Sequence, residues 1–179
     1  LSNSALRGGP SMRLPGQWTG SFWVNSGSPK PPPVEFGTAT IRADEESRRY
    51  HEWWVAAGWR PSNAVTLSLE PSYSKNVDEL QYVSPASMAD SPRYLLGTID
   101  QRTAALTFRI DVALRPNLTV QYYGAPFLAN GSYREFKRVT VPHAAAYQDR
   151  FHVFGPEEIQ YADGNYEVDE NQDGSVDYE

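Results

Sequence analysis

The segment TFRIDVALRPNLTVQYYGAPF, residues 107–127, decides the fold of this chain. Four apolar residues stand at every second position of its first half: Phe108, Ile110, Val112 and Leu114. Alternation with period two predicts a β-strand with one apolar face and one polar face. The turn residues Arg115-Pro116-Asn117 follow, and a second strand comes after them. We therefore expect a hairpin whose apolar face packs against the inside of a curved sheet or sandwich, or against a partner subunit.

The rest of the chain has the same character. Its 14 Pro, 13 Gly and 13% aromatic residues are typical of many strands joined by turns. Further strands are expected at 17–24, 34–42, 49–59, 64–74, 77–83 and 93–99. The Pro-rich stretch Ser26–Val34 predicts a long turn, and Arg60-Pro61-Ser62-Asn63 repeats the Arg-Pro turn of the first hairpin.

Alternation disappears from Asn130 onward, where we expect a short helix at Tyr133–Arg138 and irregular structure. The predicted fold class is all-β, with a curved antiparallel sheet, sandwich or partial barrel and an irregular or short-helical C-terminal third. The length of 179 residues suits one main domain. We expect an antiparallel β domain over 1–156 and an acidic C-terminal segment over 157–179.

Charge is distributed unevenly along the chain. Residues 157–179 contain nine acids and no Lys or Arg, while all 16 Lys and Arg precede them. Because no dense basic stripe is present, nucleic-acid binding is not expected. The chain has no Cys, which excludes disulfides and thiolate metal sites. It also has no apolar run of the roughly 18 residues that a spanning helix needs. It begins at Leu1 without a recognisable signal peptide, as an internal or processed piece would.

Several segments together carry a family likeness: LRGGPSMRLPGQW (6–18), WRPSNAVTLSLEPSYS (59–74), QYV (81–83), FRIDVALRPNLTVQYYGAPFLANGSYREFKRV (108–139) and YEVDENQDGSVDYE (166–179). In this order they resemble the C-terminal β-barrel region of the DUF5916 family. Members of that family are envelope proteins with an N-terminal carbohydrate-binding-like domain and a long outer-membrane-type β region, and no function is established for them. The resemblance implies an architecture and a location, with this chain lacking parts of the family pattern at both ends.

The sharpest chemical motif is DENQDGSVD, residues 169–177. Its oxygen-bearing side chains follow the spacing of a calcium loop: Asp169, Asn171, Asp173, Ser175 and Asp177. Hard oxygens at positions one, three and five with Gly at six favour calcium. The chain ends before the acid expected at position twelve, so the alternative is an acidic turn whose charges are solvated. Calcium is the only cofactor that the sequence suggests.

Aromatic residues define an expected interface: Trp18, Trp23, Trp53, Trp54, Trp59, Tyr122 and Tyr123. Trp53 and Trp54 are adjacent, so in a strand they point to opposite faces and cannot enter the same core. Amphipathic indole rings favour lipid headgroups, sugars or other proteins. The alternative is a two-layer sheet that buries both faces.

Catalytic motifs are not recognisable. His51, His143 and His152 lack metal-ligand spacing, and no nucleophile motif accompanies the sequence neighbours Asp149 and His152. We therefore expect no enzyme activity.

The predicted function is that of a non-enzymatic, membrane-extrinsic structural subunit. It would bind and stabilise a larger bacterial membrane protein complex and reach the membrane through partners, in the periplasm. A photosynthetic reaction-centre and light-harvesting complex is one host to consider. The alternatives are a segment of an integral outer-membrane β-barrel of pore or transporter type, and a calcium- or carbohydrate-binding module.

Overall fold

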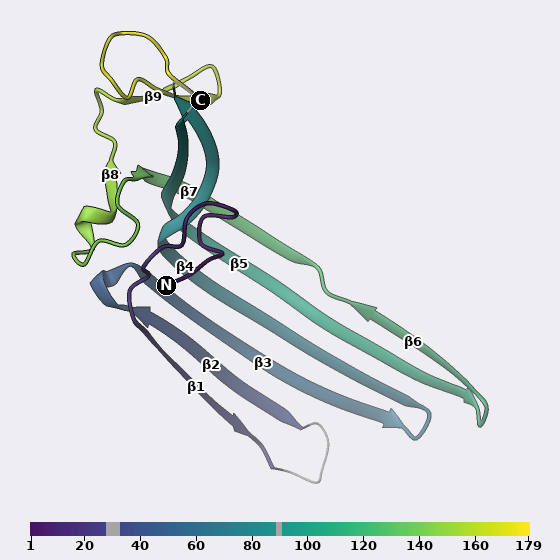
Figure 1. Ribbon diagram of the computed structural model, residues 1–179. Helices are drawn as coiled ribbons and strands as arrows, with labels where there is room; N and C mark the ends of the chain where they lie inside the picture. Colours follow the sequence, from purple (N-terminus) through teal and green to yellow (C-terminus); the bar gives the residue numbers. More distant parts are fainter. Residues whose placement is uncertain (28–32, 89–90) are drawn as a thin grey trace.

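The computed structural model describes residues 1–27, 33–88 and 91–179 and consists mainly of antiparallel strands (Figure 1). Its elements are β1 (Gln17–Asn25), β2 (Val34–Ala43), η1 (Asp44–Glu46), β3 (Arg48–Ser62), β4 (Val65–Met88), β5 (Ser91–Arg115), β6 (Leu118–Gly124), β7 (Phe127–Val139), η2 (Gln148–Arg150), β8 (Phe151–Val153), β9 (Ile159–Ala162) and β10 (Asn165–Val168). The predicted all-β class with a curved antiparallel sheet is confirmed. Residues 28–32 of the predicted long turn lie outside the described residues, and Val34 already belongs to β2.

Eight strands form one antiparallel sheet, of which seven follow the order β1-β2-β3-β4-β5-β7-β8 and the eighth, β6, also pairs with β5. β6 pairs with β5 over 108–115, and β7 pairs with it over 95–105, so both lie along the same side of β5. β9 and β10 form a separate two-stranded hairpin. Within the part of the chain that the structure describes, this sheet remains open, with β1 at one edge.

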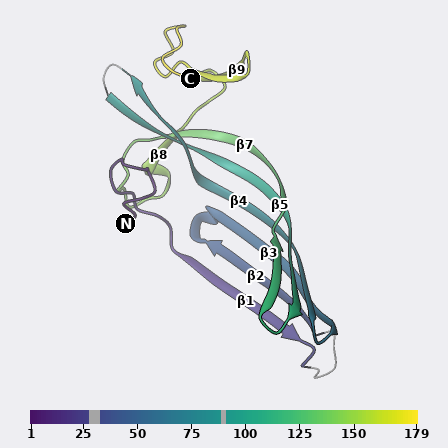
Figure 2. The same ribbon diagram turned by 90° about the vertical axis from the view of Figure 1, so that its right-hand side faces the viewer.

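The long strands β4 and β5 connect two different regions. Register shifts occur in their pairing between Asp78 and Gln81 and between Tyr82 and Ser84. Extra residues in one strand bend a sheet, and Figure 1 shows both strands curving upward from the broad sheet. Both chain termini lie away from the hairpin tips at the other end of the sheet (Figures 1 and 2).

The buried core lies where β4 ends and β5 begins, next to the N- and C-terminal segments of the chain. One cluster contains Leu95, Phe154, Val168 and Tyr178. A second cluster contains Leu6, Met12 and Leu96. These clusters join the N-terminal segment, β5 and the C-terminal segment. The hairpin tips lie beyond both of them, so the broad sheet extends away from the core.

The prediction of a short helix at Tyr133–Arg138 is wrong, because these residues belong to β7. Thr98 pairs with Arg134 and Leu96 with Lys137, which leaves one extra residue on β7 between the pairs. Glu135 has a φ of 51° there. This bulge brings Tyr133 and Phe136, three positions apart, into a stacked pair with centroids 6.1 Å apart. The bulge thus brings side chains three positions apart into contact, a spacing that is otherwise typical of a helix.

Candidate interaction surface: the apolar face of the sheet

Strand register divides the side chains of the broad sheet between two faces. Paired residues lie on the same face, and neighbours along a strand lie on opposite faces. One face carries Phe22, Val24, Phe36, Trp53, Val55, Ala57, Trp59, Val65, Leu67, Leu69, Pro71, Tyr73, Ala104, Leu106, Phe108, Ile110, Val112, Val120 and Tyr122. We call this set the apolar face. It continues across six strands, from β1 to β6.

Solvent reaches much of the apolar face. Val24 is 54% exposed, Trp59 56% and Leu69 47%. A hollow of about 620 Å³ opens on this surface and is lined by residues that include Trp59, Leu67 and Phe108. Of the four residues expected to pack against the inside of a curved sheet or sandwich, Phe108 and Val112 are half-buried on the curved sheet, while Ile110 is 36% and Leu114 59% exposed. Packing against a partner stays a prediction.

The opposite side of the sheet is the polar face. It carries Glu35, Glu52, Trp54, Thr66, Ser68, Glu70, Ser72, Thr103, Thr107, Arg109, Asp111, Gln121 and Tyr123. Arg109 pairs with Asp111 at 3.0 Å. The indole Nε1 of Trp54 donates to Glu35 at 3.3 Å. The polar face therefore contains charged groups and polar contacts that the apolar face lacks.

A row of polar residues ends the apolar face on the side of the core. The register aligns Thr40, His51, Lys75, Arg102 and Asn130 across β2, β3, β4, β5 and β7. The next row inward contains Trp53 and Tyr73, whose rings stack at 6.2 Å. We call the first set the boundary row. On β3 and β4, polar side chains of the boundary row thus have aromatic side chains only two residues away along each strand.

The predicted aromatic interface residues are divided between the two faces. The apolar side holds Trp18, Trp53, Trp59 and Tyr122, and the polar side holds Trp23, Trp54 and Tyr123. Opposite orientation of Trp53 and Trp54 agrees with the prediction. A single flat partner cannot contact all seven side chains, because the sheet separates them. Leu67, which pairs with Trp59, and its same-face neighbour Leu69 were not predicted as interface residues, although their alternation in the sequence could have indicated them.

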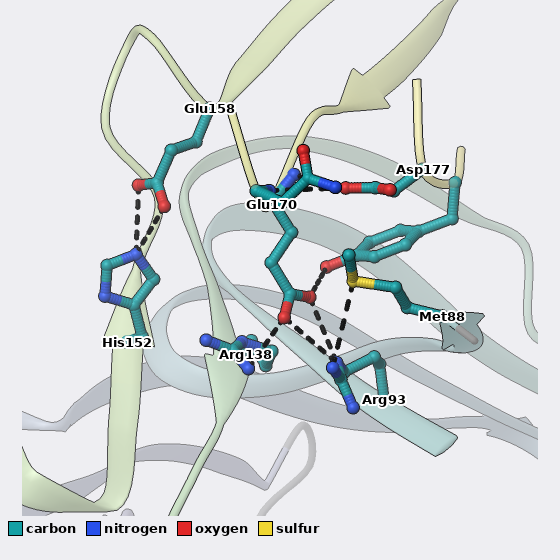
Figure 3. A network of polar contacts seen from close by, with 9 residues as sticks. Met88, Arg93, Arg138, His152, Glu158, Glu170 and Asp177 are labelled. Carbon is teal, nitrogen blue, oxygen red and sulfur yellow. Dashed lines mark hydrogen bonds and ion pairs between the residues drawn. The ribbon is translucent and has the colours of Figure 1, made fainter. Parts of the chain in front are cut away.

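The acidic C-terminal segment is bound to the sheet by one carboxylate. Glu170 accepts from Arg93 of β5 at 3.0 Å and forms an ion pair with Arg138 of β7 at 2.8 Å (Figure 3). The hydroxyl of Tyr178 also donates to Glu170, at 2.8 Å. Glu170 is only 9% exposed. Its contacts therefore hold residues 157–179 against the core, and not all acids of this segment are simply solvated.

Electrostatic surroundings stabilise the ionised form of Glu170. Burial alone would raise the pKa of this carboxyl, but the hydrogen bonds from Arg93 and Tyr178 and the charge of Arg138 hold the pKa below its ordinary value. Burial and the nearby carboxylate raise the pKa of Tyr178. The network fits a structural role, because Arg93, Arg138 and Tyr178 all satisfy the same carboxylate.

His152 pairs with Glu158, and not with its sequence neighbour Asp149. The Nε2 atom of His152 lies 2.8 Å from a carboxylate oxygen of Glu158 (Figure 3). Glu158 also accepts from the backbone N–H of Gly155 at 2.8 Å. Burial would raise the pKa of Glu158, but the hydrogen bonds with Gly155 and His152 and the charge of Arg138 lower it. Among the described residues, no nucleophile is hydrogen-bonded to His152 or Glu158. The contacts of Glu158 with His152 and Gly155 close the loop that follows β8.

The segment that resembles a calcium loop, residues 169–177, is closed by hydrogen bonds from its own backbone N–H groups to its carboxylates. Asp169 accepts from the N–H of Asp173 at 3.1 Å and of Gly174 at 2.8 Å. Asp177 accepts from the N–H of Glu170 at 2.8 Å. Within the described ranges, no group of three or more His, Asp or Glu side chains is arranged to hold a metal ion. The carboxylates are directed at backbone donors, and calcium binding by this loop stays a prediction.

Comparison of the chain with protein-family models, with curated proteins and with solved structures gave no match. Among the residues that the structure describes, no helix is long and apolar enough to cross a membrane.

Proposed function

We propose that this protein is a non-enzymatic structural subunit of a bacterial membrane protein complex, located at the cell envelope on the periplasmic side. The observation that carries the proposal is the continuous apolar face of β1 to β6. Soluble monomers rarely expose apolar patches larger than about 300–600 Å². Burial of this face against an apolar surface provides the free energy of attachment, at about 25 cal/mol per Å² of apolar area removed from water.

The open sheet favours a protein as the partner. β1 pairs on one side only within the described residues. Lipid cannot satisfy the backbone N–H and C=O groups of an open edge, and each unsatisfied group costs several kcal/mol in hydrocarbon. A protein partner can cover the apolar face and pair with the edge at the same time. The subunit would thus clamp and stabilise its host through surface burial, without a chemical reaction.

Native co-purification tests this proposal. The chain would be isolated from its own membranes in mild detergent, followed by size exclusion and mass spectrometry. We expect it to co-elute with membrane subunits in fixed stoichiometry and to be released by a urea wash, which weakens apolar contacts, and not by salt alone. Elution in detergent micelles without other subunits would contradict the proposal.

A second candidate function is a segment of an integral outer-membrane β-barrel. The observation that favours it is the length of the apolar band. On β5 the band extends from Ala104 to Val112, nine positions or about 30 Å at about 3.4 Å per residue. Transmembrane strands of about 9–11 residues cross the bilayer when tilted. The aromatic pair Trp53 and Tyr73 beside a basic boundary row also fits the level of lipid headgroups.

Single cysteines distinguish the two candidates, because the chain has no Cys of its own. Leu106→Cys places a label on the apolar face, and Thr107→Cys places the matched control on the polar face. Each label is a polarity-sensitive fluorophore, read in native membranes with and without lipids that carry a quencher on the acyl chain. Quenching at position 106 alone supports the barrel segment. A blue shift at position 106 without quenching supports burial against protein.

A further inference from the structure

The outer edge of β1 is unusual among the edges of this sheet. All nine residues of Gln17–Asn25 pair with β2 in an uninterrupted register. On its other side, β1 has no strand partner in the part of the chain that the structure describes. Figures 1 and 2 show β1 as the outermost strand along its whole length. It therefore presents a long, regular row of backbone groups to the surroundings.

Hydrogen-bond alternation identifies the backbone groups that face outward. The N–H of Ser26 donates to the carbonyl of Val34 at 2.8 Å, which places even-numbered residues in the hydrogen-bonded pairs with β2. The N–H and C=O groups of odd-numbered residues then point to the open side. These residues are Thr19, Ser21 and Trp23 in the middle of β1. Each offers one donor and one acceptor to an incoming strand.

Natural edge strands usually carry devices that prevent pairing, such as charges, Pro, bulges or short length. The sequence QWTGSFWVN of β1 has no charged residue and no Pro, and its register has no bulge. The opposite edge is less regular, because it is divided between β6, which is also uncharged but only seven residues long, and β7, which carries Arg134 beside the bulge at Glu135. The far edge is therefore short and interrupted, whereas β1 offers nine residues in one unbroken register.

We propose that the outer edge of β1 is a strand-pairing site that accepts an extended, uncharged polypeptide segment with apolar residues at every second position. Backbone hydrogen bonds to Thr19, Ser21 and Trp23 provide the affinity, as in β-strand addition. The incoming segment needs an apolar residue at every second position, because its residues opposite Phe22 and Val24 would continue the apolar face. The absence of charge on β1 disfavours charged segments, which would place an unpaired charge beside this surface. This inference deepens the edge pairing of the proposed function, and it is tested on the isolated chain, so that it can fail while attachment through the apolar face holds.

Backbone amide exchange with a defined probe tests the proposal. The probe is a synthetic peptide of residues 17–25, which is uncharged and carries Trp18, Phe22 and Val24 on one face of the strand, added to the full chain in mild detergent. The control peptide has the same composition in an order that divides these three residues between the two faces. We expect the probe peptide to slow exchange at Thr19, Ser21 and Trp23 at least tenfold, with little change at Phe22, whose amide already bonds to β2. No slowing, or equal slowing by both peptides, overturns the proposal.

Two substitutions at one position sharpen the test. Ser21→Pro removes an outward donor and blocks the edge, while Ser21→Ala keeps the N–H group. Slowing at Thr19 and Trp23 is expected to persist in Ser21→Ala and to disappear in Ser21→Pro, and slowing that persists in both contradicts the proposal. Chemical shifts of Ala39, the pair partner of Ser21, report whether β1 stays folded. If Ser21→Pro does not fold, the comparison of the two peptides on the unsubstituted chain still decides.

Discussion

Trp53 of β3 stacks on Tyr73 of β4, with ring centroids 6.2 Å apart and ring planes 20° apart. His51 stacks on the same indole at 5.9 Å. Both Trp53 and Tyr73 remain 43% exposed on the apolar face. Aromatic pairs of this kind contribute about 0.5–1.5 kcal/mol beyond their area burial. The pair is therefore ordered and still available to a partner, at the place where the boundary row meets the apolar band.

A charge on the apolar face should prevent membrane attachment. Leu69→Arg places a guanidinium in the middle of this face, while Ser68→Arg places it on the polar face. Arg on the lipid face of a membrane strand costs about 2–4 kcal/mol, and a comparable penalty at an apolar protein interface corresponds to roughly 30- to 1000-fold weaker association. We expect unfolding free energies of the isolated variants to stay within about 0.5 kcal/mol of the original. The measurement is the fraction of each variant that sediments with native membranes, and equal sedimentation of the two would contradict the assignment of faces.

Substitution of Gly37 tests the packing of the polar face. A Cβ atom at this position would overlap the indole ring of Trp54. Gly37→Ala should displace the ring, break its contact with Glu35 and cost about 1–3 kcal/mol of unfolding free energy. The matched control is Gly131→Ala on β7, where the nearest atom lies 3.6 Å from the added Cβ. Urea unfolding and tryptophan fluorescence measure both variants, and equal stabilities would refute the packing argument.

Neutralising Glu170 should loosen the C-terminal segment. Glu170→Gln leaves Arg93 and Arg138 without their shared carboxylate. Breaking a fully buried ion pair costs about 3–5 kcal/mol, and because both arginines are more than 20% exposed, we expect about 2 kcal/mol. Urea unfolding gives this value, and hydrogen exchange at residues 168–178 should accelerate. Glu157→Gln, at an exposed position, serves as control, and equal effects of both substitutions would argue against the network.

The lowered pKa values of Glu158 and Glu170 predict loss of stability in acid. In the folded state both pKa values lie below the ordinary 4.5. The unfolded chain therefore binds more protons over this range, and stability increases with pH. The contribution is complete above the ordinary pKa and is lost as pH falls through the lowered value. Urea midpoints between pH 7 and pH 3 should decrease below about pH 5. Glu170→Gln should flatten this dependence more than Glu157→Gln, and an unchanged slope would contradict the predicted shift.

Local patterns predicted much of the broad sheet. The hairpin around Arg115-Pro116-Asn117, with β5 ending at Arg115 and β6 beginning at Leu118, is confirmed. Alternation in a strand needs no information from distant residues, because successive side chains must point to opposite faces. For the same reason, the opposite orientation of Trp53 and Trp54 could be predicted from their adjacency alone. The bulge at Glu135 could not be predicted from the sequence, because the extra residue exists only relative to the pairing of β7 with β5.

Local spacing and turn chemistry were enough to predict the all-β class and the two-faced strands. The position of the core around Leu95 and Leu96, away from the exposed apolar face, is apparent only in the folded structure. The same is true of the contacts of Glu170 with Arg93 and Arg138 and, within the described residues, of the open edge of β1. Each of these depends on which distant strands pair and in which register, since pairing between residues far apart in the chain has no local signal.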